Sequence, residues 1–255
     1  MNIDDIKISI ITPTFNSGST IVETYNSISK QTHENWEWLV TDDCSSDDTI
    51  NILSSICEKD SRVRVFKNST NSGAAVTRNN SLSNVSGDFI TFIDSDDLWF
   101  SSKLEKQLNF MIVNELDFTF TAYELVDAQG IPLGKVVDLQ GDNFSVNYSD
   151  MLKKKATLGC STVMIKKNAF SDFSMPLIRT GQDYALWLKL LKSGKKAHLL
   201  NEILTRYRIL PNSISRNKFK KSQRQWNIYR EIENLSVLQS AYCFCFYAWR
   251  AIFRK

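Results

Sequence analysis

The sequence has little glycine and proline, and it lacks the cysteine spacing that builds small cross-linked scaffolds. It contains 9 glycines and 4 prolines in 255 residues, which excludes collagen-like and low-complexity chains. Its five cysteines are odd in number and none belongs to a CxxC pair, so neither a disulfide framework nor a zinc site is predicted. Free thiols of this kind fit a reducing cytosol.

Long apolar runs are also missing. No stretch reaches the roughly 20 apolar residues that a membrane-spanning helix needs. The nearest, 235–249, is interrupted by Ser236, Gln239 and Ser240. The first seven residues carry two aspartates ahead of a short apolar run, so no signal peptide is predicted and we expect a cytoplasmic protein.

The common nucleotide and hydrolase motifs are absent as well. There is no GxGxxG after a strand, no GxxxxGK[ST] and no GxSxG. The two histidines, His33 and His198, lack a partner pattern for a metal or a catalytic triad. Any phosphate would therefore be bound by basic side chains together with a metal ion.

The first hundred residues show short apolar runs that alternate with segments of helical spacing. The composition, 42% hydrophobic and 23% charged with a net charge of +3, is that of a folded protein. This alternation predicts an α/β fold with a mostly parallel central sheet flanked by helices. Strands are expected at 8–12, 36–41, 62–66, 89–93, 118–125 and 159–165, and helices at 19–30, 47–57, 74–85, 103–113, 183–192 and from 218 onwards.

Three polar clusters follow expected strands, at 12–16, 41–48 and 94–97. The carboxyl ends of parallel strands are where open sheets bind ligands. Carboxylates gathered at one edge repel one another, and a divalent cation with oxygen ligands, Mg²⁺ or Mn²⁺, relieves that repulsion. Asp47 and Asp48 are typical helix caps, whereas three aspartates within 94–97 favour a metal or nucleotide site.

Four segments resemble, in order and spacing, the motifs of the family 2 inverting glycosyltransferases, which have the GT-A fold. They are Ile10–Asn16, Val40–Thr49, Asn71–Asn79 and Phe92–Trp99. Within that family the chain is most similar to enzymes that build bacterial O-antigen and capsule repeat units. The resemblance covers roughly residues 7–215. It implies a Rossmann-like nucleotide-sugar-binding half at 1–100, an acceptor-binding half at 101–215 and a helical tail at 216–255.

The resemblance implies roles for residues of the first half. Asp43 matches the aspartate that binds the uracil base, Pro13 lies at the end of the base-binding strand, and Arg78 matches a basic residue near the nucleotide. Asp94 and Asp96 match the residues of the DxDD motif that bind the nucleotide sugar.

The same motif implies the metal site. Asp96 and Asp97 match metal-binding positions, with Asp97 expected as the direct ligand of Mn²⁺ or Mg²⁺. Such an ion offsets charge that develops on the departing UDP.

Inverting transfer also needs a general base on the face opposite the leaving group. The segment Gly181–Trp187 resembles the family's ED motif, in which the aspartate is the base, so Asp183 is the expected base. A helix N-cap is the structural alternative for Asp183. Asp172 and Glu202 are the next candidates.

Two positions depart from the family pattern. Cys44 stands where a glycine usually follows the two aspartates, which suggests that the backbone avoids a positive φ there or accepts some strain. Leu210 stands where a histidine often contacts the diphosphate, and Arg208 or Arg216 could replace it.

The tail combines basic residues, among them Lys218, Lys220, Lys221 and Arg224, with the aromatic run 242–253. This pattern fits a peripheral anchor on the inner membrane and, equally, a helix packed on the domain. No nucleic-acid module accompanies the basic residues, so no nucleic-acid partner is predicted.

Together these features predict a metal-dependent inverting glycosyltransferase. The expected donor is a UDP-hexose, glucose before galactose, and the expected acceptor is a lipid-diphosphate-linked sugar at the cytoplasmic face of the inner membrane. Two alternatives stay open: a non-catalytic sugar-nucleotide or polysaccharide-binding protein of the same fold, and a nucleotidyltransferase. The second would need a glycine-rich triphosphate loop near the N-terminus, which 12–19 does not supply.

Overall fold

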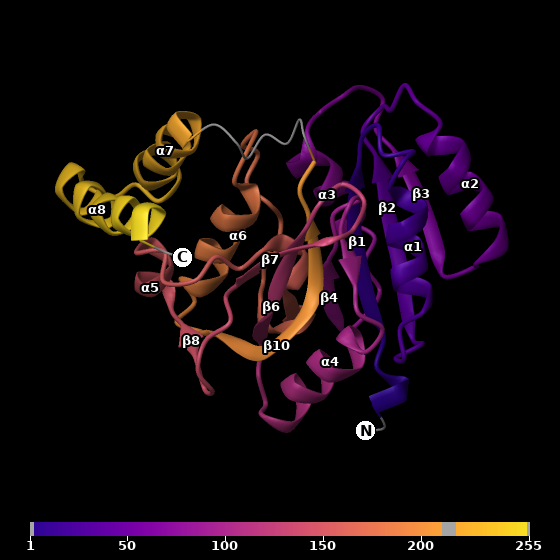
Figure 1. Cartoon of the computed structure of the whole chain (residues 1–255), viewed down its shortest axis with the longest axis horizontal. Coiled ribbons are helices and arrows are strands. Elements are labelled where there is room, and N and C mark those ends of the chain that lie inside the picture. Colours follow the sequence, from indigo (N-terminus) through magenta and orange to yellow (C-terminus); the bar gives the residue numbers. More distant parts are fainter. Residues whose placement is uncertain (1–2, 211–217, 254–255) are drawn as a thin grey trace.

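The computed structural model describes residues 3–210 and 218–253. A single sheet of ten strands runs through the molecule, in the order β3-β2-β1-β4-β9-β6-β10-β5, with β7 beside β6 and β8 beside β10 (Figure 1). The strands are β1 Ile8–Thr14, β2 Trp36–Asp42, β3 Val63–Lys67, β4 Phe89–Phe92, β5 Leu98–Trp99, β6 Phe118–Val126, β7 Pro132–Val137, β8 Ser145–Val146, β9 Met164–Lys166 and β10 Ala197–Arg208.

Helices cover both faces of this sheet. The α-helices are α1 Ile21–Ser29, α2 Thr49–Lys59, α3 Ala74–Leu82, α4 Lys103–Val113, α5 Tyr148–Leu152, α6 Gln182–Leu191, α7 Lys218–Asn227 and α8 Val237–Phe253. Three short 3-10 helices (Ile3–Asp5, Cys160–Thr162, Lys167–Ala169) and a π-helical turn (Ile228–Ile232) complete the described elements.

Strand β1 shows why both faces are covered. Ile8 and Ile10 belong to one buried cluster, with α1, α2 and α4, whereas Ile11 belongs to the other, with α3 and α6. Successive side chains of a strand point to opposite faces, so a strand that is buried along almost its whole length, as β1 is, needs a layer on each side. The expected α/β fold, with a central sheet flanked by helices, is confirmed.

The strand directions add one refinement. The pairs among β1 to β4 and the pair β6–β10 are parallel, but β9 runs antiparallel to both β4 and β6. The sheet is therefore parallel in its first part and mixed in its second. Strands β5, β7, β8 and β10 were not expected from the sequence.

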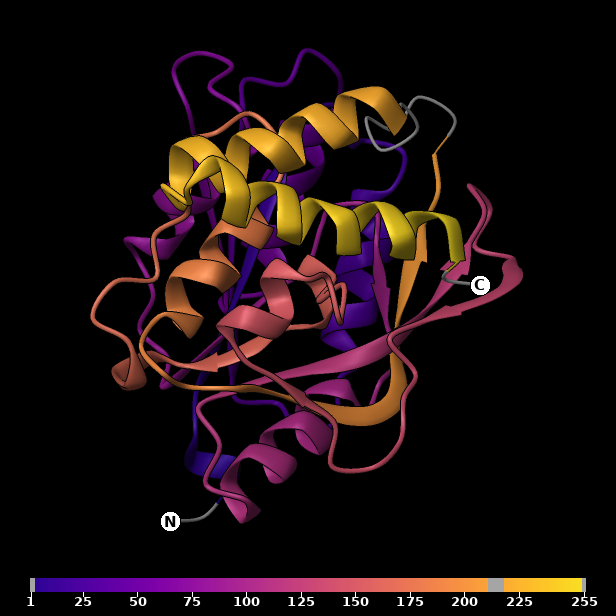
Figure 2. The same ribbon diagram turned by 90° about the vertical axis from the view of Figure 1, so that its left-hand side faces the viewer.

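The tail forms a helical pair that lies beside α5 and α6 (Figures 1 and 2). The Tyr229 hydroxyl donates a 2.5 Å hydrogen bond to the Leu152 carbonyl, and the Tyr148 hydroxyl donates one of 2.5 Å to Glu233. The Trp226 and Phe244 rings meet edge to face, which joins α7 to α8. The tail is therefore packed on the domain, and one face of α8 stays exposed.

Candidate active site

Strand β4 ends in the acidic segment Asp94–Asp97, a tight turn in which the Asp97 amide donates to the Asp94 carbonyl at 3.1 Å. Asp94 and Asp96 are half-buried. Burial and the neighbouring Asp94 carboxylate raise the pKa of Asp96 to about 6. A divalent cation at this point would remove the repulsion between the two carboxylates, so the pair fits Mg²⁺ or Mn²⁺.

Asp97 is oriented differently, and only 1% of it is exposed. Its Oδ2 accepts a 2.5 Å hydrogen bond from the Ser161 hydroxyl, and its Oδ1 accepts one of 3.0 Å from the Arg208 amide. Burial and the neighbouring Asp96 and Asp94 raise its pKa. Asp97 thus ties the acidic turn to β10, a geometry that favours an anchoring role over direct metal coordination.

Arg78 lies on α3 and is buried beside the acidic turn. Its Nη2 donates to the Asp94 carboxylate, whereas its Nε and Nη1 are buried and lack hydrogen-bond partners among the described residues. Burial would lower the pKa of Arg78, but the neighbouring Cys160, Asp94 and Asp183 raise it. Because buried donors without partners are costly, two of its nitrogens are available to an anionic ligand.

Asp183 lies in the first turn of α6, half-buried and near Arg78. The N-cap of this helix is Gly181 with φ +78°, so Asp183 is not the cap that the structural alternative required. Gln182, next to it, has a buried Oε1 with no described partner. The structure therefore brings Arg78, Asp94 and Asp183, which are far apart in the sequence, to one place.

The two other candidate bases have different surroundings. Glu202 forms an exposed ion pair with Lys106 of α4, at 2.5 Å. Asp172 is paired with Lys189, and this contact together with the Ser174 hydrogen bonds lowers its pKa to about 2. A carboxylate that binds protons so weakly is a poor general base.

Asp43 holds the loop that precedes α3. Its carboxylate accepts hydrogen bonds of 2.8 Å each from the Asn68 side chain, the Ser72 amide and the Gly73 amide. A carboxylate has about four acceptor positions. Asp43 therefore orders the loop that precedes α3. Little of its acceptor capacity remains for the uracil base of a nucleotide.

The end of β1 places Pro13 beside Thr41 of β2. Phe15, which the sequence analysis did not select, follows it and is 50% exposed. Its neighbour Asn16 contacts the β2–α2 loop. The Asn16 backbone amide donates to the Ser45 hydroxyl at 2.9 Å, and the Asn16 side-chain oxygen accepts from the Ser46 amide at 2.8 Å.

Cys44, at the position where the family usually has glycine, has a φ of +64° and therefore adopts the strained conformation.

Arg208 is fully engaged within the protein and is not free to replace the family histidine. Its Nε donates to the Asp96 carbonyl at 2.8 Å, its Nη1 donates to the Ala128 carbonyl at 2.7 Å, and its Nη2 contacts Glu23. The other candidate, Arg216, lies outside the described residues.

A cavity of about 400 Å³ lies at the ends of β6, β7 and β10, and we call it the β7 cavity. Tyr207 of β10 lines this cavity and also lies near the acidic turn. Burial and, after it, the charges of Asp97, Asp94 and Asp96 raise the pKa of Tyr207. Sequence reasoning missed this cavity because β7 and β10 were not expected. Its polar and aromatic lining includes Tyr123, Lys135, Asp138, Thr157, Tyr207 and Lys221.

Comparison with known proteins assigns the family. Residues 9–171 match the model of Glycosyl transferase family 2. The chain belongs to this family. The glycosyltransferase is 43% identical over 248 residues to the putative teichuronic acid biosynthesis glycosyltransferase TuaG of Bacillus subtilis, with 97% of each chain covered. It is also 39% identical to an Escherichia coli protein, WfgD, over 91% of this chain and 88% of that one. WfgD is described as a UDP-Glc:alpha-D-GlcNAc-diphosphoundecaprenol beta-1,3-glucosyltransferase.

Solved structures support the fold of the glycosyltransferase. TarS 1-349 of S. aureus in complex with UDP-GlcNAc superposes with a TM-score of 0.76 at 22% identity, over 97% of this chain and 73% of that one. The mannosyltransferase PcManGT of Pyrobaculum calidifontis, in complex with GDP-Man and Mn²⁺, gives 0.70 at 14% identity, over 96% and 70%. Within residues 3–210 and 218–253, no helix is both long and apolar enough to cross a bilayer.

Proposed function

We propose that this glycosyltransferase moves a hexose with inversion from a UDP-sugar to a lipid-diphosphate-linked sugar during bacterial surface polysaccharide (O-antigen) synthesis. Glucose is the first expected sugar and galactose the second. The observation that carries the proposal is that Arg78, Asp94 and Asp183 lie close together. Arg78, which has two buried nitrogens without hydrogen-bond partners among the described residues, and Asp183, in the first turn of α6, both lie beside the acidic turn. The activity of the relative WfgD supports the donor and acceptor classes.

The donor would bind along the carboxyl ends of β1, β2 and β4. Pro13 and the exposed Phe15 would face the uracil base of the donor. Asp43 would contribute indirectly, by fixing the loop at residues 68–73. Asp94 would contact the ribose while it holds Arg78 in place. The free nitrogens of Arg78 would then reach the anionic part of the donor.

Asp96 is the better of the two expected metal ligands. Its pKa is raised mainly by burial and by Asp94, a conflict that a cation would remove, whereas both oxygens of Asp97 already accept hydrogen bonds. No group of three or more metal-binding side chains occurs among the described residues, so diphosphate and water would complete the coordination. A bound Mn²⁺ or Mg²⁺ would supply Lewis-acid stabilisation of the leaving UDP.

Asp183 would take the proton of the acceptor hydroxyl as its oxygen attacks the anomeric carbon of the donor, and UDP would leave from the opposite face. The first turn of α6 holds this carboxylate close to Arg78. Arg78, close to both Asp94 and Asp183, would stabilise negative charge that develops between them.

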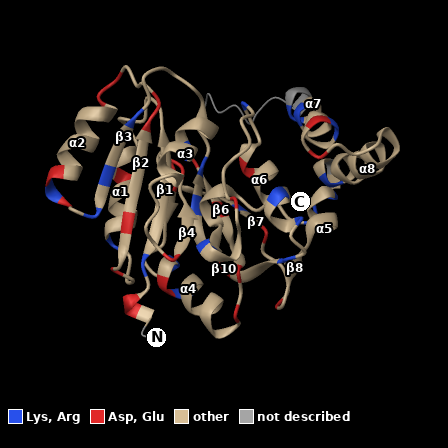
Figure 3. Cartoon of the chain, turned by 180° about the vertical axis from the view of Figure 1, so that it is seen from behind, with Lys and Arg blue, Asp and Glu red and all other residues tan. Residues whose placement is uncertain are grey.

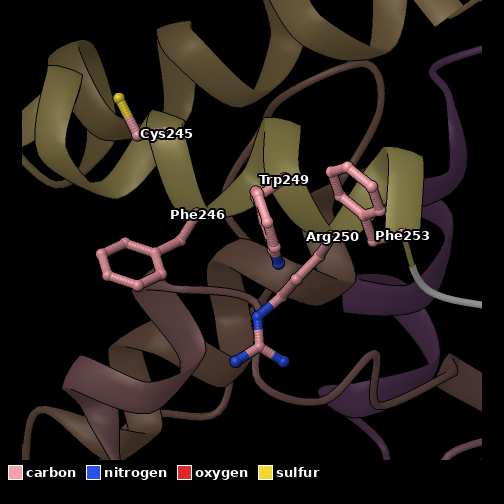
Figure 4. Close-up of a pocket in the computed structure, with 5 residues that line it drawn as sticks. All are labelled: Cys245, Phe246, Trp249, Arg250 and Phe253. Carbon is pink, nitrogen blue, oxygen red and sulfur yellow. The ribbon is translucent and has the colours of Figure 1, made fainter.

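Peripheral contact with the inner membrane would use α8. Leu238, Tyr242, Trp249 and Phe253 form one face of this helix and are 83%, 57%, 62% and 58% exposed. The Nζ of Lys153 lies 5.5 Å from the Tyr242 ring, so a cation borders the aromatic face. Figure 4 shows Trp249 and Phe253 on α8 beside Arg250, whose Nη1 donates a 3.3 Å hydrogen bond to the Lys155 carbonyl of the domain. Aromatic and basic residues in this arrangement suit the surface of an anionic bilayer at the cytoplasmic side.

A panel of UDP-sugars with a synthetic sugar-diphosphate-lipid acceptor tests this function. We expect glycosylated acceptor and UDP in equal amounts, in a reaction that stops with EDTA and resumes with Mn²⁺ or Mg²⁺. UDP binding without product would instead support the non-catalytic alternative, and release of diphosphate from UTP would support a nucleotidyltransferase.

A further inference from the structure

Helix α7 places two cations beside the candidate site. Lys221 lines the β7 cavity. Arg224 packs on Gly181, where an added Cβ would lie 3.1 Å from Arg224 Cδ and 3.3 Å from its Nε. Gly181 stands two residues before Asp183, so the basic face of α7 borders both the cavity and the expected base. This orientation differs from the membrane-facing role expected for these two residues from the sequence.

Within residues 3–210 and 218–253, no carboxylate forms an ion pair with either of these two cations. Among the same residues, Arg224 Nε is buried without a hydrogen-bond partner. Burial and the neighbouring Arg224 lower the pKa of Lys221, so the two cations lie close enough to repel each other.

The cavity lining adds positive charge and offers no free carboxylate. Lys135 of β7 lines the cavity together with Lys221. Asp138 is the acidic residue of the lining. Its carboxylate accepts hydrogen bonds of 2.9 Å from the Thr157 and Leu158 amides, so its oxygens are already bonded to the backbone. A polyanion that reaches from the β7 cavity to the start of α6 would relieve the repulsion between Lys221 and Arg224 and would offer an acceptor to Arg224 Nε.

We propose that Lys221 and Arg224 bind the diphosphate of the sugar acceptor and so hold its sugar over Asp183. The substrate class rests on the proposed function. A diphosphate is also present in the donor, but the cavity is built by β6, β7 and β10, whereas the donor motifs follow β1, β2 and β4. The position beside α6 therefore favours the acceptor diphosphate over that of the donor.

A direct binding measurement tests this proposal independently of the proposed function, because it does not require turnover. Geranyl diphosphate is titrated calorimetrically into protein saturated with UDP in excess Mg²⁺, so that the donor position is already filled. We expect the wild type to bind, and the variants Lys221→Gln and Arg224→Gln to bind about tenfold or more weakly, since a hydrogen bond to a charged group contributes about 1.5–3 kcal/mol. Lys59→Gln, which neutralises an exposed lysine at the end of α2, serves as the charge-matched control.

Kinetics supply the second readout. With the lipid-diphosphate acceptor, the α7 variants should raise the acceptor KM about tenfold and leave the KM for the UDP-sugar unchanged. With a simple alkyl glycoside of the same sugar, variants and wild type should turn over equally. Three outcomes overturn the proposal: unchanged geranyl diphosphate binding in both variants, displacement of UDP by geranyl diphosphate, or a rise in the donor KM. Binding as expected in a protein without turnover would reject the proposed function and leave the diphosphate site standing.

Discussion

Asp183 gives the sharpest prediction at the scale of single residues. Asp183→Asn keeps the size of the side chain and removes its ability to accept a proton, so kcat should fall about 10²–10⁴-fold while the Kd for UDP stays unchanged. Asp172→Asn is the matched control, because that carboxylate is paired with Lys189. Stopped-time product assays and calorimetry measure the two quantities. Normal turnover of Asp183→Asn, or a comparable loss in Asp172→Asn, would place the base elsewhere.

Substitutions of the two neighbouring aspartates of the acidic turn should have different effects, one on metal binding and the other on stability. Asp96→Asn should weaken Mn²⁺ binding in the presence of UDP, as followed by electron paramagnetic resonance, because a charged oxygen ligand is removed. Asp97→Asn should lower the free energy of unfolding by about 1–3 kcal/mol, because its hydrogen bonds with Ser161 and Arg208 are disturbed. Loss of Mn²⁺ binding in Asp97→Asn alone would restore Asp97 as the direct ligand.

Asp43 should contribute to stability in a pH-dependent way. Burial would raise its pKa, but hydrogen bonds from Ser72, Asn68 and Gly73 lower it overall. A carboxylate whose folded pKa is depressed stabilises the fold above its unfolded pKa of about 4 and loses that contribution as the pH falls through the folded value. Asp43→Ala should therefore lower Tm near pH 7 and do so less as the solution is acidified. A Tm difference that is constant with pH would contradict this account.

Residues whose partners are distant in sequence could not be assigned from sequence alone. Arg208 contacts Glu23, 185 positions away, and Ala128, 80 positions away. Nothing in the segment around Arg208 indicates that its donors are engaged, and so it was expected to be available for a phosphate. Arg78 and Asp183 were selected through family resemblance, because no local pattern predicts their proximity.

At the scale of elements, periodicity located the first part of the sheet well and failed at β10. Strands β1 to β4 are short, apolar and bounded by turns, which makes them recognisable. Strand β10 shifts register between Leu200 and Ile203 and again between Ile203 and Thr205, so its inward and outward residues do not alternate. The β7 cavity depends on β7 and β10, and it was missed for the same reason.

Helix α8 carries the element-scale prediction. Trp249→Ser should weaken sedimentation with anionic vesicles, because an exposed aromatic side chain is removed from the face of α8 that we propose contacts the membrane. Val113→Ser on α4, where the valine is 78% exposed, is the control and should bind as the wild type does. Turnover of a short water-soluble acceptor should be the same in all three proteins. Equal vesicle binding by Trp249→Ser and wild type would show that this face serves another purpose.

In the proposed function, the whole molecule combines a donor-binding edge of the sheet, a general base at the start of α6 and a helical pair, α7 and α8, that borders the acceptor side. Figure 3 shows acidic and basic residues interspersed over its elements, in keeping with the net charge of +3. We therefore expect specificity for the substrate diphosphates to depend on local groups such as Arg78, Arg224 and Asp96.

The configuration of the new glycosidic bond tests the central claim most directly. The α-linked UDP-sugar that turns over is incubated with the sugar-diphosphate-lipid acceptor, and the purified product is examined by proton NMR. A single attack opposite the leaving UDP, with Asp183 as base, predicts a β-linked hexose and no α-linked product. An α-linked product, or none with any UDP-sugar in the presence of Mn²⁺, would contradict the account.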